Sequence, residues 1–302
     1  MPFILKKFDA QKGEKIQLFL LKNLGYKPAV AHRLISRGRI FDSKQRSYLI
    51  SESISEDYIY VALFEGHTRG LKPLHTFIDF AIFDKPSGLV IHPNSKKTEY
   101  SLLDEIRFHF GEKANQAHRI DAETSGLVLV GKHEKATNAL AGMFETKDYK
   151  KSYLAIVQGK ISKELTIDKN LKKEGKNIGV RMATCENDEG KHSITHVKPI
   201  EYNSEKDITL IELIPITGRQ HQIRIHLYSI GHRILGDPIY GVEDISAEGY
   251  LNKTLNDEDR KKASGSHRLW LHANYLEFDF KGVTYKIYSK NRDIYKFFNL
   301  KN

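Results

Sequence analysis

Hydrophobic and polar residues follow two rhythms along this chain, one typical of short helices and one typical of strands. Near the amino terminus Ile16, Phe19, Leu20 and Leu24 recur at helical spacing. Gly25 follows them, and a glycine just past the last apolar position is a common helix stop. This pattern predicts a first amphipathic helix that ends before Gly25.

A second helix is predicted between Pro28, at its first turn, and Gly38, just past its end. Arg33 and Arg37 are four residues apart and therefore share one exposed face of this helix. A strand-rich segment that ends at residues 58–63 follows. The apolar side chains that the second helix can bury are Val30, Leu34 and Ile35.

The polar segment Gly66–Pro73 contains glycine and proline, and it predicts a linker at residues 67–75. Beyond it, helices are expected at Ser101–Phe110, stopped by Gly111, and at His133–Lys147. Strands are expected at Phe77–Phe83, Leu127–Val130, Ser152–Gln158, Ser193–Ile200, Ile208–Ile214, Tyr275–Phe280 and Val283–Tyr288.

Lys281-Gly282 separates the last two strands, which is the spacing of a two-residue hairpin. The region Asp168–Glu189 has little periodicity and predicts exposed loops or a weak hairpin. Hairpins mixed with isolated helices favour an α+β fold with a mixed, largely antiparallel central sheet flanked by helices.

The composition is that of a globular protein: 40% of the 302 residues are hydrophobic and 28% are charged. The single cysteine, Cys185, excludes an internal disulfide and a multi-cysteine metal site. We find no apolar run near the ~18 residues of a membrane helix and no signal-peptide pattern. We therefore expect a soluble, monomeric protein of a reducing compartment, the cytoplasm, with no membrane partner.

The positive charge is concentrated at the amino terminus. The whole chain has 48 Lys and Arg against 38 Asp and Glu, a net charge of +10. Residues 1–50 alone hold 11 basic and 3 acidic residues, so 11 − 3 = +8. A basic run on its own is usually a solubilising surface, but here it lies on two patterned helices. We therefore expect a compact unit that meets a polyanion.

Three stretches could carry chemistry, and the first is residues 118–126, HRIDAETSG, which directly precede an apolar strand. A Ser-Gly turn into that strand would mount Asp121 at its edge, and Arg119, two residues away, could keep the carboxylate ionised. Spacing alone favours a simpler interpretation, in which Asp121 and Thr124 only stabilise a tight turn.

The second stretch is residues 217–227, TGRQHQIRIHL. Thr217 could cap a helix that ends before Gly231, and His221 and Arg224 would share one face of it. The alternative is a helix face that is simply exposed to solvent, which the apolar stripe of Ile223 and Leu227 beside these polar residues makes less consistent with the pattern. The third stretch, residues 150–159, places Lys151 and Tyr153 on one face of a strand, which could equally be an ordinary half-exposed strand.

Familiar cofactor motifs are missing. The chain has no G-x-G-x-x-G, no G-x-x-x-x-G-K-[ST] and no G-x-S-x-G. His221 and His226 are five residues apart, which is poor spacing for two metal ligands on a helix. We therefore expect no cofactor and no metal.

Taken in order, several motifs closely resemble the RluA-type family of pseudouridine synthases. They span residues 77–280, and two departures, Gln220 and Asp84, fall outside the positions assigned to chemistry. The motifs are DKPSGLVIHP (84–93), HRIDAETSGL (118–127), KSYLAIVQG (151–159), TGRQHQIRIH (217–226), GHRILGDPIYG (231–241) and LHA (271–273).

The resemblance implies the pseudouridine synthase fold and isomerisation of uridine to pseudouridine in RNA without a cofactor. It makes Asp121 the catalytic nucleophile, Tyr153 the tyrosine that packs on the uracil and is implicated in proton removal, and Arg224 the partner of Asp121. Arg119 would enter the RNA stack when the target base flips out. The residues implied to line the RNA-facing cleft are His118, Lys151, Arg219 and His221.

Residues 1–66 resemble the alpha-L RNA-binding module of the S-four type, a small α/β unit, and Arg33, Arg37 and Arg39 would contact RNA phosphates. The expected organisation is this module, a linker at 67–75 and a catalytic domain at 76–302. Such a module favours a ribosomal RNA target, while a transfer RNA target stays open. The alternative hypothesis, from another functional class, is a non-catalytic RNA-binding or ribosome-assembly protein.

Overall fold

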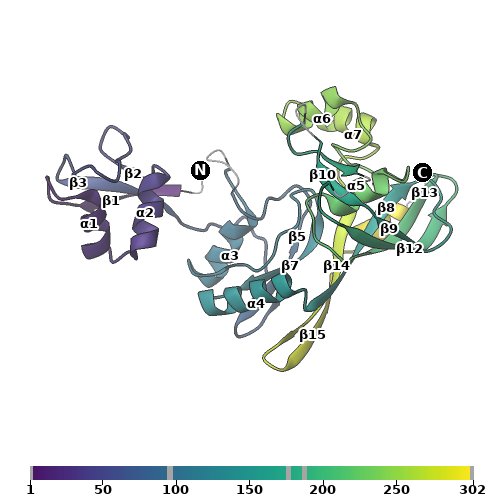
Figure 1. Ribbon diagram of the computed structural model, residues 1–302, viewed down its shortest axis with the longest axis horizontal. Coiled ribbons are helices and arrows are strands. Elements are labelled where there is room, and N and C mark those ends of the chain that lie inside the picture. The colour runs from purple at the N-terminus through teal and green to yellow at the C-terminus, as the bar shows by residue number, and fades with distance from the viewer. Residues whose placement is uncertain (1–2, 94–97, 175–177, 186–188, 300–302) are drawn as a thin grey trace.

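The computed structural model describes residues 3–93, 98–174, 178–185 and 189–299. It consists of a small N-terminal unit, residues 3–64, and a larger part built on a ten-stranded sheet. Figure 1 shows the N-terminal unit set to one side of the larger part. Within the described ranges, none of the helices has the length and apolar character needed to cross a membrane.

The N-terminal unit packs two short helices on a three-stranded antiparallel sheet of order β1-β3-β2. Both expected helices are present, and Gly25 and Gly38 follow them with φ of +65° and +58°, the left-handed values that favour glycine. Ile16, Phe19 and Leu20 are buried in a core of its own. Its elements are β1 (Phe3–Asp9), α1 (Ile16–Lys22), α2 (Pro28–Ser36), β2 (Ile40–Phe41) and β3 (Tyr58–Phe64).

The segment predicted to be a linker is bound to helix α3 (Leu102–Phe110). The backbone amides of Arg69 and Leu71 both donate to a carboxylate oxygen of the buried Glu105, at 2.6 and 3.3 Å. Gly66 lies so close to α3 that an added Cβ would come within 2.5 Å of the Asp104 carbonyl oxygen. The connection between the two parts is therefore held along α3 by hydrogen bonds.

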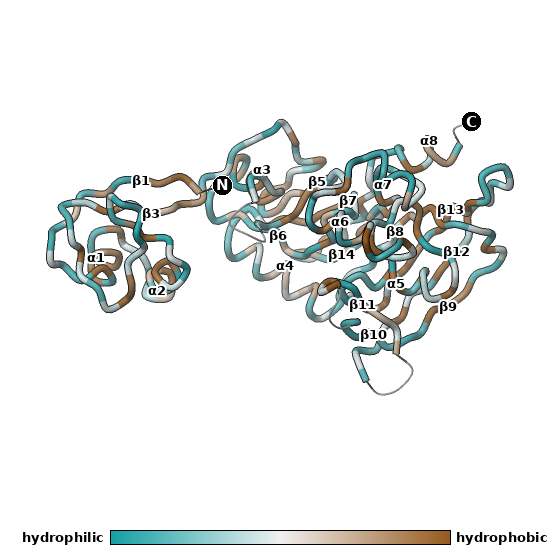
Figure 2. Tube along the Cα trace, turned by 90° about the horizontal axis from the view of Figure 1, so that it is seen from above, coloured by the Kyte–Doolittle hydropathy of each residue, from teal (hydrophilic) through white to brown (hydrophobic). Residues whose placement is uncertain are grey.

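The larger part confirms the expected α+β class with a mixed, largely antiparallel sheet. The strand order is β4-β5-β7-β14-β8-β13-β12-β9, with β15 paired to β14 and β6 to β7. Figure 2 shows hydrophobic residues concentrated along its central strands. The strands of this sheet are β4 (His75–Thr76), β5 (Phe80–Lys85), β6 (Asn115–Gln116), β7 (Ser125–Gly131), β8 (Tyr149–Gln158), β9 (Leu165–Asp168), β12 (Ile194–Asn203), β13 (Ile208–Pro215), β14 (Leu271–Phe280) and β15 (Val283–Tyr288).

The helices begin and end largely where capping residues predict. Ser101 and Asp104 form a reciprocal capping box on α3, and Gly111 ends that helix. His133 caps α4 by accepting from the Ala136 amide. The remaining helices are α4 (Glu134–Thr146), α5 (Gln222–Tyr228), α6 (Asp244–Leu251), α7 (Asp257–Ser264) and α8 (Asp293–Asn299).

Three local predictions can be compared directly with the strands. The strand expected at Phe77–Phe83 begins only at Phe80, so the prediction was wrong for its first three residues. These residues turn between β4 and β5, where the Phe77 amide donates to the Phe80 carbonyl. Lys281 and Gly282 form the predicted two-residue turn, both with positive φ. The weak hairpin is present as β10 (Asn170–Lys173) and β11 (Met182–Cys185), while residues 175–177 and 186–188 of that region lie outside the described ranges.

Candidate active site

One small cavity of about 130 Å³ is lined by residues from all three candidate stretches. Three parts of the chain meet there: the loop before β7, strand β8, and α5 with its preceding turn. Among the residues that line it are Arg119, Asp121, Lys151, Tyr153, Arg219, His221 and Arg224. The structure thus brings three separate sequence motifs to one place.

Asp121 lies in a tight turn four residues before β7, and Ser125 and Gly126 belong to the strand rather than to the turn. The turn is closed by the backbone, because the Thr124 amide donates to the Asp121 carbonyl at 3.2 Å. The Asp121 side chain is not used in the turn; it points toward the cavity and is 31% exposed. The simpler interpretation, in which this carboxylate only stabilises the turn, is therefore wrong.

Arg224 on α5 is the cation that faces this carboxylate. Its NH1 atom lies 3.3 Å from Asp121 Oδ2, across 103 residues of sequence. The other side of its guanidinium binds Asp237 in a two-point pair, with Nε–Oδ2 at 2.7 Å and NH2–Oδ1 at 2.8 Å. The exposed Arg119, expected from its nearness in sequence to ionise Asp121, lies at the cavity rim instead.

The pair Arg224–Asp237 is buried, with side-chain exposures of 3% and 1%. Burial alone would lower the pKa of Arg224, but the Asp237 carboxylate and then Asp121 raise it above its usual value. Burial would likewise raise the pKa of Asp237, yet Arg224 and the backbone amides of Ile239 and Tyr240 hold it below its usual range. Arg224 therefore stays a fixed cation.

His221 also faces the carboxylate, with Nε2 at 3.8 Å from Asp121 Oδ2. Burial and the neighbouring Arg224 lower the pKa of His221 to about 4, so the ring is neutral near pH 7. Its Nδ1 pairs with the Tyr240 hydroxyl at 3.0 Å, and that hydroxyl already accepts from the Met182 amide. The Tyr240 hydroxyl has one proton to donate, and in the tautomer in which it donates to Nδ1 the ring proton is on Nε2, toward Asp121.

Strand β8 contributes Lys151 and Tyr153, which share one face as predicted. Burial, reinforced by Tyr149 and Asp121, raises the pKa of the Tyr153 hydroxyl, so it is a neutral phenol near pH 7. Burial lowers the pKa of Lys151 to about 8. Its Nζ lies 5.8 Å from the Tyr153 ring centre, within cation–π range.

Arg119 and Arg219 are exposed at the rim of the cavity. His118 is a correction to the expected set, because it is not among the residues that line the cavity. Its ring stacks on Phe144 with a centroid distance of 4.3 Å, and Nε2 accepts from the Leu129 amide of β7 at 3.0 Å. Burial lowers the pKa of His118 to about 3, so this ring is neutral near pH 7 and supports strand β7 through the Leu129 amide.

The three arginines predicted to meet phosphates lie in the N-terminal unit. Arg33 and Arg37 are exposed at the carboxyl end of α2, whereas Arg39 is partly buried over the Phe3 ring at 4.1 Å. Burial, followed by Arg37, Arg33 and Arg107, lowers the pKa of Arg39. The like charges therefore stand close together.

Thr217 is a second correction. Helix α5 starts at Gln222 and its cap position is His221, which has a positive φ of 53°. Thr217 instead donates to the Gln222 side chain at 2.7 Å and accepts from the Ile194 amide at 3.0 Å, so it fastens the loop before α5 to strand β12. The predicted apolar stripe of Ile223 and Leu227 is buried as expected.

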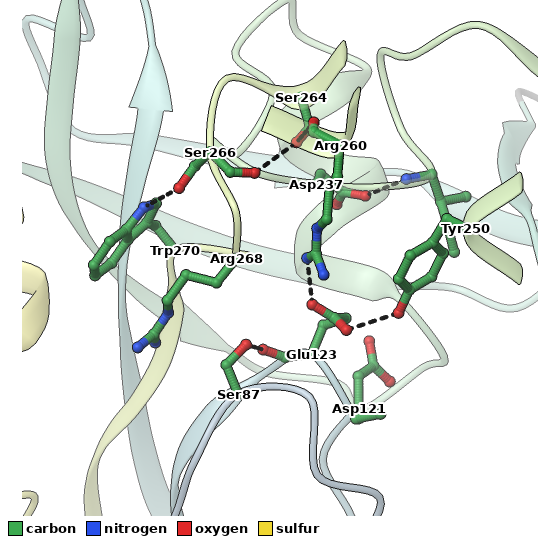
Figure 3. Close-up of polar contacts among 12 residues, drawn as sticks. Ser87, Asp121, Glu123, Asp237, Tyr250, Arg260, Ser264, Ser266, Arg268 and Trp270 are labelled. Atoms are coloured by element: carbon green, nitrogen blue, oxygen red, sulfur yellow. Dashed lines mark hydrogen bonds and ion pairs between the residues drawn. The ribbon is translucent and has the colours of Figure 1, made fainter. Parts of the chain in front are cut away.

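The sequence prediction assigned no role to Asp237, Tyr240 or Glu123. Asp237 and Tyr240 lie within the motif at 231–241, so a search for a carboxylate able to neutralise a buried Arg224 could have found Asp237. Glu123, two residues after Asp121, binds Tyr250 and Arg260 (Figure 3). Among the described residues, no group of three or more His, Cys, Asp or Glu side chains is placed to hold a metal ion.

Comparison with known proteins identifies a family domain that covers this part of the chain. The family model described as RNA pseudouridylate synthase matches residues 79–229, which hold Asp121, Tyr153 and Arg224. A Helicobacter pylori protein named an uncharacterized RNA pseudouridine synthase is 38% identical over 297 residues, 96% of each chain. Ribosomal large subunit pseudouridine synthase D of Zymomonas mobilis is 36% identical over 169 residues, 53% of this chain and 52% of that protein.

The fold is also similar to that of a solved pseudouridylate synthase structure. The solved structure of human RNA pseudouridylate synthase domain containing 1 superposes with a TM-score of 0.59, at 23% identity, over 76% of this chain and 87% of that one. At this identity the likeness concerns the fold alone. The family model, the full-length relative and the fold agree, and the chain belongs to the RNA pseudouridylate synthase family.

Proposed function

We propose that this chain isomerises specific uridines of ribosomal RNA, with Asp121 as the nucleophile. The observation that carries the proposal is the Asp121 carboxylate in the cavity, facing an arginine that Asp237 locks in place. A carboxylate is both a nucleophile and a good leaving group, as a reaction requires in which the glycosidic bond breaks and uracil carbon 5 rejoins the sugar. Attack on the anomeric carbon and attack on the uracil ring both begin with this group.

The other residues of the cavity have supporting roles in the proposal. Arg224, with its permanent charge, holds the carboxylate in place through NH1. Tyr153 packs on the uracil; its raised pKa keeps the hydroxyl protonated, which leaves little phenolate to accept a proton, so packing is the role we assign first. Arg119 at the rim is exposed and can enter the RNA stack in place of the flipped nucleotide. Lys151, Arg219 and His221 line the path of the RNA.

The choice of ribosomal RNA rests on two observations. The Zymomonas mobilis relative is named for the large ribosomal subunit. The N-terminal unit carries exposed Arg33 and Arg37, and we propose that it is an S-four-type module that binds RNA phosphates. The boundaries at 1–66 and 76–302 belong to the same proposal.

Tritium release from RNA labelled at uracil carbon 5 tests the reaction, with ribosomal and transfer RNA fractions assayed separately. We expect release from ribosomal RNA by the wild type and a loss of about 10³-fold or more in Asp121→Asn. That variant should remain folded because Arg224 keeps its two-point pair with Asp237. Asp257→Asn, an exposed position on α7, is the matched control and should retain full activity.

Each other result has a definite meaning. If tritium were released from transfer RNA alone, the substrate would be transfer RNA and not ribosomal RNA. Full activity in Asp121→Asn would refute the assignment of Asp121 as the nucleophile. No release from any fraction would favour the rival interpretation, a non-catalytic RNA-binding or ribosome-assembly protein.

A further inference from the structure

Helices α6 and α7, which precede strand β14 in the sequence, form a pair outside the ten-stranded sheet (Figure 1). Neither helix contributes a side chain to the wall of the cavity. The pair nevertheless reaches the turn that carries Asp121, and it does so through one side chain of that turn, Glu123.

Glu123 is 7% exposed, and both of its carboxylate oxygens are used. Oε1 accepts from the Tyr250 hydroxyl of α6 at 2.8 Å, and Oε2 pairs with Arg260 NH2 of α7 at 2.5 Å. Figure 3 shows the carboxylate between these two side chains, with Asp121 beside them. Tyr250 is 127 and Arg260 is 137 residues away in sequence, so only the fold brings them here.

The backbone of the same turn is held from the opposite side. The Glu123 carbonyl accepts from Ser87 Oγ at 2.6 Å, and the Ala122 carbonyl accepts from Lys85 Nζ at 2.8 Å and from the Gly88 amide at 2.9 Å. The turn is therefore fixed between the loop after β5 and the pair α6–α7.

Breaking the contact between Glu123 and the pair α6–α7 would cost free energy. Arg260 is only 13% exposed, and its Nε has no hydrogen-bond partner among the described atoms, so Glu123 is the group that compensates its charge. Removing one partner of a buried pair leaves the other charged group uncompensated. Glu123 thus ties the backbone that follows Asp121 to the two helices, so the position of that backbone depends on where the helices lie.

We propose that Glu123 is a positioning residue, through which α6 and α7 set the place of the Asp121 carboxylate against Arg224. The proposal rests on the proposed function of Asp121 as the reacting group. A shift of the turn would move this carboxylate relative to the target nucleotide without altering the surface that binds RNA. The loss should therefore appear in kcat and not in KM.

The test measures kcat and KM for tritium release with Glu123→Gln, Arg260→Met and the double variant. We expect each single variant to lower kcat about tenfold, a fraction of the ~10²-fold that a 1 Å misplacement can cost, with KM unchanged. Because both substitutions break the same pair, the double variant should lose no more than a single one. Lys261→Met, which removes a neighbouring exposed cation of α7, is the matched control and should leave kcat unchanged.

A second variant covers the case in which these proteins do not fold. Tyr250→Phe keeps the ring and the Glu123–Arg260 pair but removes one neutral hydrogen bond, and we expect about a threefold loss in kcat. An unchanged kcat in a folded Glu123→Gln, or in Tyr250→Phe if only that variant folds, overturns the proposal. So do losses in the single variants that multiply in the double variant, or a change confined to KM.

A structural readout separates this proposal from the proposed function. In a crystal structure of Glu123→Gln, the Asp121 Oδ2–Arg224 NH1 separation should lengthen from 3.3 Å beyond the 3.5 Å hydrogen-bond limit, and in Lys261→Met it should not. A lengthened separation together with a wild type that releases no tritium would refute the function and keep the coupling. An unchanged separation with an active wild type would refute the coupling alone.

Discussion

At the scale of single residues, Arg224 is central to the geometry of the site because it contacts two carboxylates at once. Asp237 takes the two-point face of the guanidinium, and Asp121 takes the remaining NH1. The buried Asp237 neutralises the cation within the fold, while the partly exposed Asp121 faces the cavity. The charge of Arg224 is thereby held in one place, facing the Asp121 carboxylate.

Asp237→Asn should therefore cost more stability than the loss of an ordinary surface ion pair. It leaves Arg224 buried without its compensating charge, and we expect the free energy of unfolding to fall by about 3–5 kcal/mol. Asp244→Asn breaks the pair with Arg181 at 56% exposure of the acid, and it should cost less than about 1 kcal/mol. Urea unfolding of the two variants checks this; equal losses would contradict the role given to Asp237.

His221 gives a prediction for the dependence of stability on pH. Its pKa is about 4 in the folded chain against 6.5 for the ordinary group, so between these values the unfolded chain binds more protons. Its contribution to stability is therefore present above pH 6.5 and is lost as the pH falls toward 4. His118 and His226, with pKa values lowered by burial to about 3 and about 4, act in the same direction.

Urea unfolding between pH 7 and pH 4 measures this effect. The free energy of unfolding of the wild type should fall more steeply with decreasing pH than that of His221→Gln. Activity should show no step from His221 between pH 5 and 8, because the ring is neutral throughout. Parallel stability curves for the two proteins would contradict the lowered pKa.

At the scale of elements, the site depends on one exceptional strand pair. Strands β7 and β14 pair in parallel within an otherwise antiparallel sheet, through Ser125–His272 and Gly126–Ala273. Gly126 has a φ of +109°, and an added Cβ would lie 2.3 Å from the Ala273 carbonyl oxygen. Only glycine allows this close approach, which anchors the end of the turn that carries Asp121.

Gly126→Ala should consequently destabilise the protein by about 3 kcal/mol or more, through the clash and the disfavoured φ. Gly142→Ala is the matched control, since Gly142 lies within α4 with nothing within 4 Å of the added Cβ. It should stabilise the helix by about 0.5–1 kcal/mol. Thermal unfolding measures both changes, and a Gly126→Ala variant as stable as the wild type would show that the strand pair can yield.

At the scale of the whole molecule, the N-terminal unit is joined to the catalytic part along α3. Phe64 at the end of β3 packs in the same hydrophobic cluster as α3, and the Arg107 guanidinium lies over its ring at 4.6 Å. The segment that follows is hydrogen-bonded to Glu105. The N-terminal unit is therefore attached to the larger part by contacts along α3 (Figure 1).

If the N-terminal unit binds RNA phosphates, replacing exposed arginines on it should change the salt dependence of binding. For Arg33→Gln with Arg37→Gln, we expect the slope of log affinity against log salt to shrink by about 2, one for each phosphate contact. Lys286→Gln with Lys290→Gln removes the same charge near β15, outside the N-terminal unit, and should leave the slope unchanged. Equal slopes for both double variants would argue against a phosphate-binding role.

The sequence by itself determined what is encoded locally or by motif. Glycine stops at Gly25 and Gly38, the capped α3 and the Lys281-Gly282 turn are all in place, because each depends on the conformational preference of a few adjacent residues. The ordered motifs also pointed to the correct family. Local patterns were less reliable for the residues that begin elements, as Thr217 and Phe77 show.

Only the tertiary structure decided which charged groups meet. Arg224 and not the adjacent Arg119 faces Asp121, Asp237 compensates Arg224, His118 supports a strand, and Glu123 binds helices more than 120 residues away. The physical reason is that a buried charge must find a partner wherever the packed chain places one. The periodicity of the sequence does not indicate which residue that partner is, whereas the free energy of the folded chain depends on the pairing.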